Sequence, residues 1–94
     1  MSAYLIIQAK VSNWEKFKQY TDIVPEIVAT HGGEYIVMDS APIVFEGAEP
    51  GSVVVSKWPS KEAAQAFWQS DAYQNAIPLR ANTGDFHVML VNGL

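Results

Sequence analysis

The chain has 94 residues, contains no cysteine and carries a formal net charge of −4. Without cysteine it has no disulfide, no thiol nucleophile and no cysteine-ligated metal centre, and this composition favours a reducing compartment such as the cytoplasm. The negative charge repels a phosphate backbone, so we expect no nucleic-acid partner. No apolar run approaches the ~20 residues of a membrane span, and residues 1–3 carry no basic leader, so we expect neither membrane insertion nor secretion.

The first predicted strand, Ala3–Ala9, alternates its side chains between the two faces of a sheet. A helix follows, because Ser12 and Glu15 have the spacing of a capping box and apolar residues then recur at helical spacing. Pro25 lies inside that stretch and lacks a backbone donor, which predicts a kink. Gly32, near the end of the pattern, predicts a left-handed C-cap.

Two strands are predicted next, Glu34–Asp39 and Pro42–Glu46, and their close spacing is typical of a hairpin or of one strongly bent strand. Pro42 cannot donate a hydrogen bond within a sheet and therefore marks an edge. Residues 47–51 form a loop by composition. Three consecutive valines within Ser52–Trp58 then indicate a strand at the centre of the sheet.

The rest of the chain predicts two more helices and a last strand. Ser60 is the expected N-cap of the first of these two helices, and Asp71 is the expected cap of the second, shorter one, which ends at Pro78. The last strand is predicted over Asp85–Val91. The order β-α-β-β-α-β, with one added strand, predicts a ferredoxin-like α+β sandwich with both helices on one face of an antiparallel sheet. We expect a single domain over residues 1–94.

Both faces of this sheet are predicted to be apolar, although the helices cover one face alone. In the last strand, Phe86, Val88 and Leu90 share one face, and the opposite face is also rich in apolar residues. An uncovered apolar sheet face is typical of an interface. We therefore predict a homodimer through the helix-free face, which carries Tyr4, Ile6, Val53, Val55, Met89 and Val91.

A series of short motifs runs along nearly the whole chain. The motifs are Val24-Pro25, Gly32-Gly33, Phe45-Glu46-Gly47, Trp58-Pro59-Ser60, Ala66-Phe67-Trp68, Ser70-Asp71-Ala72-Tyr73-Gln74 and Arg80. In this order they resemble the family called domain of unknown function 1330. The resemblance implies ferredoxin-like protomers that pair sheet to sheet as dimeric α/β barrels. It also implies a place in a superfamily of small monooxygenases, muconolactone isomerases and haem-degrading enzymes, without supplying a reaction.

The chain departs from the family at one turn. Members often carry an Arg-Gly-Gly-like sequence there, whereas this chain has Met38, Asp39 and Ser40. An acidic residue thus stands in a neighbourhood that is basic in the family, so the resemblance gives no support for anion binding at this turn.

His87 is the best candidate for chemistry. Strict alternation places it on the helix-free face beside Gln8, since the first and last strands of this topology are neighbours. A pocket enclosed by two such faces would hold His87 as acid, base or ligand anchor near neutral pH, with Gln8 as a neutral hydrogen-bonding group. The alternative is an inert, hydrogen-bonded histidine at the subunit interface.

Three further residues are candidates for ligand binding. Arg80 follows Pro78 in a segment that could fold over the mouth of the barrel, where its guanidinium would bind a carboxylate. The alternative for Arg80 is a surface ion pair. Trp68 and Tyr73 could lie at the pocket rim, where the indole and the phenol form hydrogen bonds, although aromatic residues with this spacing also pack in cores.

The sequence offers no metal or cofactor site. No pair of histidines or carboxylates has the spacing of metal ligands, so we predict no metal site. We assign no cofactor, and the sequence leaves open whether one is used. His31, at the end of the first helix, is explained by an interaction with the last carbonyls of that helix. An axial haem ligand is the alternative that the superfamily suggests for His31.

Two classes of function remain. The first is a small enzyme or binding protein that holds a compact, partly apolar metabolite, anionic if Arg80 takes part, in an intersubunit barrel. The second is a non-catalytic structural or interaction homodimer. A single-stranded RNA binder has the same strand order, but the acidic balance and the absence of a basic-glycine-aromatic run argue against it. The sequence leaves open whether the chain catalyses a reaction.

Overall fold

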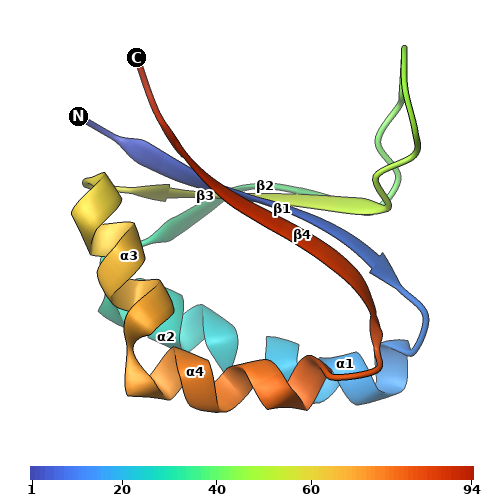
Figure 1. Ribbon diagram of the computed structural model, residues 1–94, viewed down its shortest axis with the longest axis horizontal. Helices are drawn as coiled ribbons and strands as arrows, with labels where there is room; N and C mark the ends of the chain where they lie inside the picture. The colour runs from blue at the N-terminus through green and yellow to red at the C-terminus, as the bar shows by residue number, and fades with distance from the viewer.

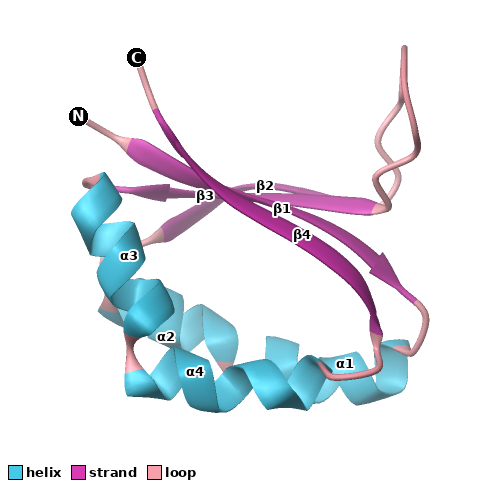
Figure 2. Ribbon diagram, viewed as in Figure 1, coloured by secondary structure: helices cyan, strands magenta, loops and turns pink.

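Four antiparallel strands form one twisted sheet, and all the helices lie on one of its faces (Figure 1, Figure 2). The computed structural model describes residues 1–94. The strands stand in the order β2-β3-β1-β4, so β3 and β1 are central and β2 and β4 form the edges. The strands are β1 (Ala3–Val11), β2 (Glu34–Asp39), β3 (Ser52–Trp58) and β4 (Gly84–Asn92).

The helix layer consists of short α-helices and one 3₁₀ turn. They are α1 (Trp14–Thr21), α2 (Val24–Thr30), α3 (Lys61–Gln69), α4 (Asp71–Ala76) and the turn η1 (Ile77–Arg80). The predicted ferredoxin-like α+β fold is confirmed, and so is the central position of β3, which pairs with both β1 and β2. None of these helices has the length and hydropathy that a membrane span requires.

The first predicted helix is in fact two helices. α1 ends at Thr21 and α2 begins at Val24, so the chain breaks where a kink was expected. Pro25 lies in the first turn of α2. Proline suits that position, because the first amides of a helix have no intrahelical acceptor and the fixed φ of proline is already helical.

The cap of α1 also differs from the predicted capping box. The Asn13 side chain, rather than that of Ser12, accepts a hydrogen bond from the Lys16 amide at 3.1 Å. The Ser12 hydroxyl donates instead to the Thr83 carbonyl, which ties the end of β1 to the segment before β4. Such a long-range bond has no signal in the local sequence.

The end of α2 agrees with the prediction. Gly32 has a φ of +87°, the left-handed conformation that glycine adopts without steric cost. Its amide donates to the Ala29 carbonyl, and the Gly33 amide donates to the Val28 carbonyl. These two bonds complete a Schellman motif, which turns the chain towards β2.

The predicted strand Pro42–Glu46 is wrong, because this segment is irregular. β2 pairs directly with β3, so the two strands expected as a hairpin are not partners. Pro42 also lacks the donor that a strand would need. The residues Ser40–Gly51 instead form an arm, which rises from the sheet on the side away from the helices (Figure 1).

The capping residues of the second half are partly as predicted. The Ser60 hydroxyl caps α3 by accepting a hydrogen bond from the Ala63 amide at 3.1 Å. α4 is capped by Ser70, one residue before the predicted Asp71, and the Ser70 hydroxyl accepts a hydrogen bond from the Tyr73 amide. Asp71 is the first residue of α4, where its negative charge still favours the helix.

The core fills one end of the space between the two layers. The rings of Trp58 and Phe67 have centroids 4.9 Å apart, and the Tyr73 ring lies 4.5 Å from that of Phe67. α1 contributes no fully buried residue, so the space between α1 and the sheet is less well filled. The buried cluster consists of Leu5, Val24, Val28, Trp58, Ala64, Phe67, Tyr73 and Ala76.

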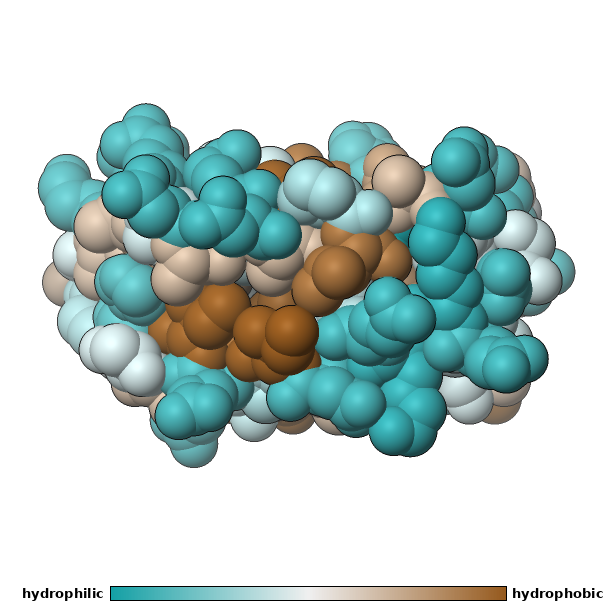
Figure 3. Space-filling model, turned by 90° about the horizontal axis from the view of Figure 1, so that it is seen from below, coloured by the Kyte–Doolittle hydropathy of each residue, from teal (hydrophilic) through white to brown (hydrophobic).

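The two outer surfaces of the molecule have different characters. The outer surface of the helix layer is mostly hydrophilic, with a hydrophobic patch near its middle (Figure 3). The opposite surface is the helix-free face of the sheet, where apolar side chains have no covering layer. These half-buried apolar residues are Tyr4, Ile6, Val53, Val55, Met89 and Val91.

Candidate ligand-binding cavity

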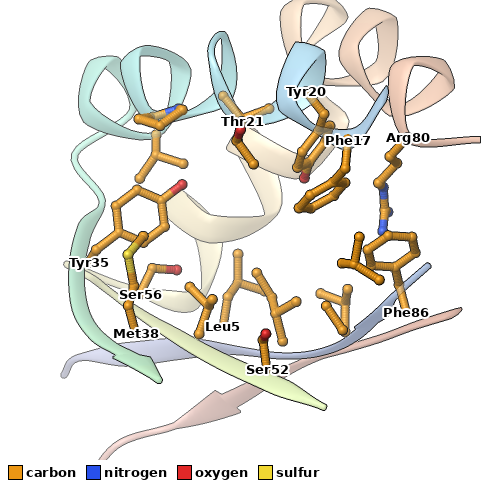
Figure 4. Close-up of a pocket in the computed structure, with 18 of the residues that line it drawn as sticks. Leu5, Phe17, Tyr20, Thr21, Tyr35, Met38, Ser52, Ser56, Arg80 and Phe86 are labelled. Carbon is orange, nitrogen blue, oxygen red and sulfur yellow. The ribbon is translucent and has the colours of Figure 1, made fainter. Parts of the chain in front are cut away.

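A cavity of about 420 Å³ lies between the sheet and the helix layer (Figure 4). Its volume falls within the roughly 300–1,000 Å³ of small-molecule sites. Of its 24 lining residues, 17 are hydrophobic, so it suits a ligand with a largely apolar body. The helices contribute Phe17, Tyr20, Thr21, Val24 and Val28, and the sheet contributes Leu5, Ile7, Ala9, Ser52, Val54, Ser56, Phe86 and Val88.

Short side chains on the sheet create this space. Ala9 and Ser52 are cross-strand partners, and both line the cavity. Ser56, further along β3, is also short, whereas the same face carries the large buried ring of Trp58 at its other end. The helix-facing side of the sheet therefore runs from a filled end at Trp58 to an open end at Ala9 and Ser52.

One cationic side chain from the helix layer lines the cavity. The Cζ atom of Arg80, at the end of η1, lies 4.6 Å from the centroid of the Phe86 ring and 5.4 Å from that of Tyr20. Its Nε is buried and has no hydrogen-bond partner. The one ion pair in the protein joins Lys18 and Asp22 on the surface, so no carboxylate neutralises Arg80.

Tyrosine hydroxyls supply the polar part of the lining. The hydroxyls of Tyr20 and Tyr73 lie 2.7 Å apart. Burial, reinforced by Tyr73, raises the pKa of Tyr20 well above 10.0, and the opposing effect of Arg80 is smaller. Burial also raises the pKa of Tyr35, which lies across the cavity from Arg80 (Figure 4). Tyr20 and Tyr35 therefore stay protonated at neutral pH, so each hydroxyl keeps a proton that it can donate to a hydrogen bond.

The structure divides the predicted site residues between the two faces of the sheet. Arg80, Trp68 and Tyr73 line the helix-side cavity. Gln8 and His87 are cross-strand partners of β1 and β4, as predicted. They lie on the helix-free face, since their neighbours along each strand line the cavity, and His87 is exposed while Gln8 is half-buried.

The prediction of one pocket shared by His87, Gln8 and Arg80 is wrong, because the sheet separates Arg80 from the other two. Periodicity gives the direction of a strand residue but not that of a residue in a turn such as η1. The chemical role of His87 and the binding role of Gln8 stay predictions, as do ligand contacts by Trp68 and Tyr73.

Sequence reasoning missed the aromatic residues around Arg80. Phe17 of α1 stacks on Phe86 of β4 with ring centroids 5.5 Å apart, and Tyr20 lies beside Phe17. Phe86 was expected on an apolar face of its strand, yet nothing local shows that this face meets α1 next to Arg80. A usable signal was the pair of short residues Ala9 and Ser52 on the helix-facing side, because small residues opposite a helix leave space in a core.

The second histidine and the acidic residues define no further site. His31 Nδ1 lies 2.9 Å from the Ile27 carbonyl, and its ring is edge-on to that of Phe67. This confirms the expected interaction of His31 with the last turn of its helix. No group of three or more histidine, aspartate or glutamate side chains lies close enough together to hold a metal ion.

The fold and the cavity define a ferredoxin-like protein with a ligand-sized space between its sheet and its helices. The chain belongs to the family called domain of unknown function (DUF1330), whose model matches residues 2–94. The family membership predicted from the sequence motifs is thereby confirmed. A comparison with curated proteins found no match to this chain.

Solved structures of similar fold include proteins of unknown function and an enzyme. A protein of unknown function from Rhodopseudomonas palustris has a TM-score of 0.83 at 13% identity, covering 99% of this chain and 82% of that chain. A dimeric ferredoxin-like protein of unknown function from Jannaschia sp. CCS1 has a TM-score of 0.78 at 10% identity, covering 99% and 100%. SnoaB, a cofactor-independent oxygenase from Streptomyces nogalater, has a TM-score of 0.69 at 10% identity, covering 99% and 93%. At these identities the likeness shows the fold alone.

Proposed function

We propose that this protein binds a compact, largely apolar, singly negative small molecule in the helix-side cavity. The observation that carries the proposal is Arg80, whose buried Nε has no partner and whose charge has no carboxylate beside it. A charge in such surroundings costs free energy unless an opposite charge joins it. A ligand carboxylate or enolate would offer two oxygen acceptors to the planar guanidinium.

The lining near Arg80 favours a flat apolar body for this ligand. The stacked rings of Phe17 and Phe86 offer an aromatic wall next to the guanidinium. Asp39 is the one carboxylate in the lining, and it is exposed and accepts a hydrogen bond from the Ala41 amide at 2.9 Å. Asp39 is therefore engaged within its own turn and forms no ion pair with Arg80. The guanidinium of Arg80 stays available for a ligand.

Catalysis on the bound anion is a second candidate function. It is favoured by the description of one structural neighbour as a cofactor-independent oxygenase. In such a reaction Arg80 would stabilise negative charge that develops on the substrate, and the protonated Tyr20 would donate a hydrogen bond. Binding is the part of the proposal that the residues around Arg80 support directly.

Matched ligand pairs test the binding proposal. We would measure thermal unfolding with a panel of small aryl and alkyl carboxylates, each paired with its neutral amide. A ligand that binds the folded chain alone raises the Tm, so a carboxylate should raise it and its amide should not. Arg80→Gln should abolish this shift, whereas His87→Gln on the other face should retain it. Equal shifts from acid and amide, or no shift from any carboxylate, would overturn the proposal and favour the non-catalytic dimer.

We also propose that two copies pair through the helix-free face. The apolar residues of that face have no cover within one chain, and relatives of similar fold are described as dimeric. Val55→Asp would place a charge on an inner strand of the face, so sedimentation should show monomers. Thr30→Asp on the exposed end of α2 is the control. A dimer that survives Val55→Asp would contradict this interface.

We propose a cytoplasmic location as well, because the chain has no cysteine and this composition favours a reducing compartment.

A further inference from the structure

We infer that the arm, Ser40–Gly51, docks on a second copy of this chain. The inference rests on the dimer proposed above, because the arm would extend the contact made by the helix-free face. The arm belongs to neither face of the sheet, so the arm could fail to contact a second copy even if the dimer forms through the helix-free face.

The arm holds its apolar side chains in solvent. Phe45 is 96% exposed and Ile43 is 83% exposed, and Val44 between them is 40% exposed. Residues 42–50 belong to no strand, and no hydrogen bond joins them to the rest of the protein. Consecutive large apolar residues exposed in this way are characteristic of an interaction site. The arm therefore lacks contacts within its own chain that would account for its composition.

The root of the arm sets its direction. Gly51 has a φ of +78°, and a Cβ at this position would overlap the Ala9 carbonyl oxygen. Glycine is thus required where the chain passes close to β1, and this close passage fixes how the arm leaves the sheet. The arm rises on the side away from the helices, which is the side of the helix-free face (Figure 1). A partner covering that face would meet the arm.

The area of the sheet face favours a second copy as the occupant. The four strands are nine, six, seven and nine residues long. At about 3.3 Å per residue and about 4.8 Å between strands, they give a flat footprint of roughly 490 Å², and their side chains make the accessible surface larger than this footprint. A stable interface buries about 800 Å² of accessible surface on each partner, so the sheet face can supply a large part of one. An aromatic side chain such as Phe45 buries about 150–250 Å², so Phe45 with Ile43 would add substantially to the contact.

The dissociation constant of the dimer provides the first test. Sedimentation over a concentration series would compare the natural chain with Phe45→Ser and Ile43→Ser. Each variant should raise the dissociation constant at least about tenfold, as expected for large apolar residues at an interface. Ile23→Ser is the matched control, since Ile23 is 46% exposed in the helix layer. It should leave the constant unchanged.

A cross-linking experiment shows where the arm lies. Because the chain has no cysteine, Phe45→Cys carries a single thiol that accepts a benzophenone label. In a mixture of isotopically light and heavy chains, irradiation should join the arm of one copy to the helix-free face of another. The same label at Ile23→Cys should give no covalent dimer. Cross-links confined to one chain would show that the arm packs against its own chain, which would overturn the inference.

The outcomes separate the inference from the dimer proposal. If Val55→Asp splits the dimer but Phe45→Ser leaves it intact, the docking of the arm is refuted and the sheet interface is retained. A natural chain that stays monomeric at every concentration refutes both proposals.

Discussion

The guanidinium carbon of Arg80 lies 4.6 Å from the centroid of the Phe86 ring, on the side of β4 that faces the cavity. Phe86 in turn stacks on Phe17 of α1, so elements from both ends of the chain surround one cation. Cation–π attraction stabilises the guanidinium by about 0.5–2 kcal/mol for each ring, but it leaves the charge without a counter-ion. Packing thus holds the Arg80 side chain in place, and an anionic ligand would neutralise its charge.

Replacing Arg80 with methionine should separate stability from binding. The free energy of unfolding should change by no more than about 1 kcal/mol in either direction, because removing an unpaired charge offsets the loss of the cation–π attraction and an apolar stem remains. The affinity for small carboxylates should fall more than about tenfold, since charge-assisted hydrogen bonds are lost. Urea unfolding measures the first quantity and calorimetry the second. Arg80→Lys, which keeps the charge without the planar fork, should retain part of the affinity. A large loss of stability in Arg80→Met would instead mark the guanidinium as a structural element.

Replacing Tyr20 with phenylalanine should destabilise the protein through its partner. The Tyr73 hydroxyl would keep its buried position but lose the bond of 2.7 Å, at a cost of about 1–2 kcal/mol. In the double variant Tyr20→Phe, Tyr73→Phe no hydroxyl is left unpaired, so its cost should be smaller than the sum of the two single costs. Urea unfolding of the four proteins in this cycle checks the expectation. Additive costs would mean that the hydroxyl pair contributes no coupling.

Tyr20 also makes stability depend on pH in the alkaline range. Burial raises the pKa of Tyr20 above the value of 10.0 that applies to the unfolded chain. Below pH 10 the group is protonated in both states, so its contribution to stability is fully present. Above pH 10 the unfolded chain releases a proton that the folded chain retains, so stability falls as the pH rises. Tyr20→Phe should show a shallower fall in the urea midpoint, with Tyr35 supplying part of the remainder. An unchanged slope would contradict this role of Tyr20.

The strands illustrate what local patterns can predict. β3 has the predicted bounds, and β1 and β4 differ from prediction by at most two residues at an end. Alternation along a strand is a local property, and it also places Gln8 and His87 on the same face of neighbouring strands once the topology is known. Local patterns are therefore sufficient for the approximate bounds of β1, β3 and β4 and for the faces of their residues.

The errors occur where distant residues decide the local structure. The apolar residues of Pro42–Glu46 have strand propensity, but β3 is the strand that pairs with β2. The Ser12 hydroxyl has the spacing of a helix cap, but the Thr83 carbonyl takes its hydrogen bond. In each case a contact outside the segment decides the outcome, the β2–β3 pairing in one and a residue 71 positions away in the other, and local propensity does not reveal it.

The cavity escaped sequence reasoning for a related reason. It is a deficit of volume where Ala9 and Ser52 lie below the helix layer, and their closeness depends on the register of β1 and β3. The direction of Arg80 depends on how η1 packs against β4, which periodicity does not describe. A residue in a turn can be recognised as a candidate by its chemistry, but its face cannot be assigned.

Filling the cavity from Ser52 should abolish binding without unfolding the protein. A leucine at this position would point into the open end of the cavity beside Ala9. Burying a leucine side chain contributes about 1.5–3 kcal/mol, and local strain offsets part of that gain, so the free energy of unfolding should stay equal or rise. Calorimetry with a carboxylate that binds the natural chain should detect no binding to Ser52→Leu. Ser52→Ala removes the hydroxyl without filling the space, and it should bind as the natural chain does. If Ser52→Leu still bound the carboxylate at full affinity, the ligand would have to lie elsewhere, and the helix-free face with Gln8 and His87 would become the site to examine.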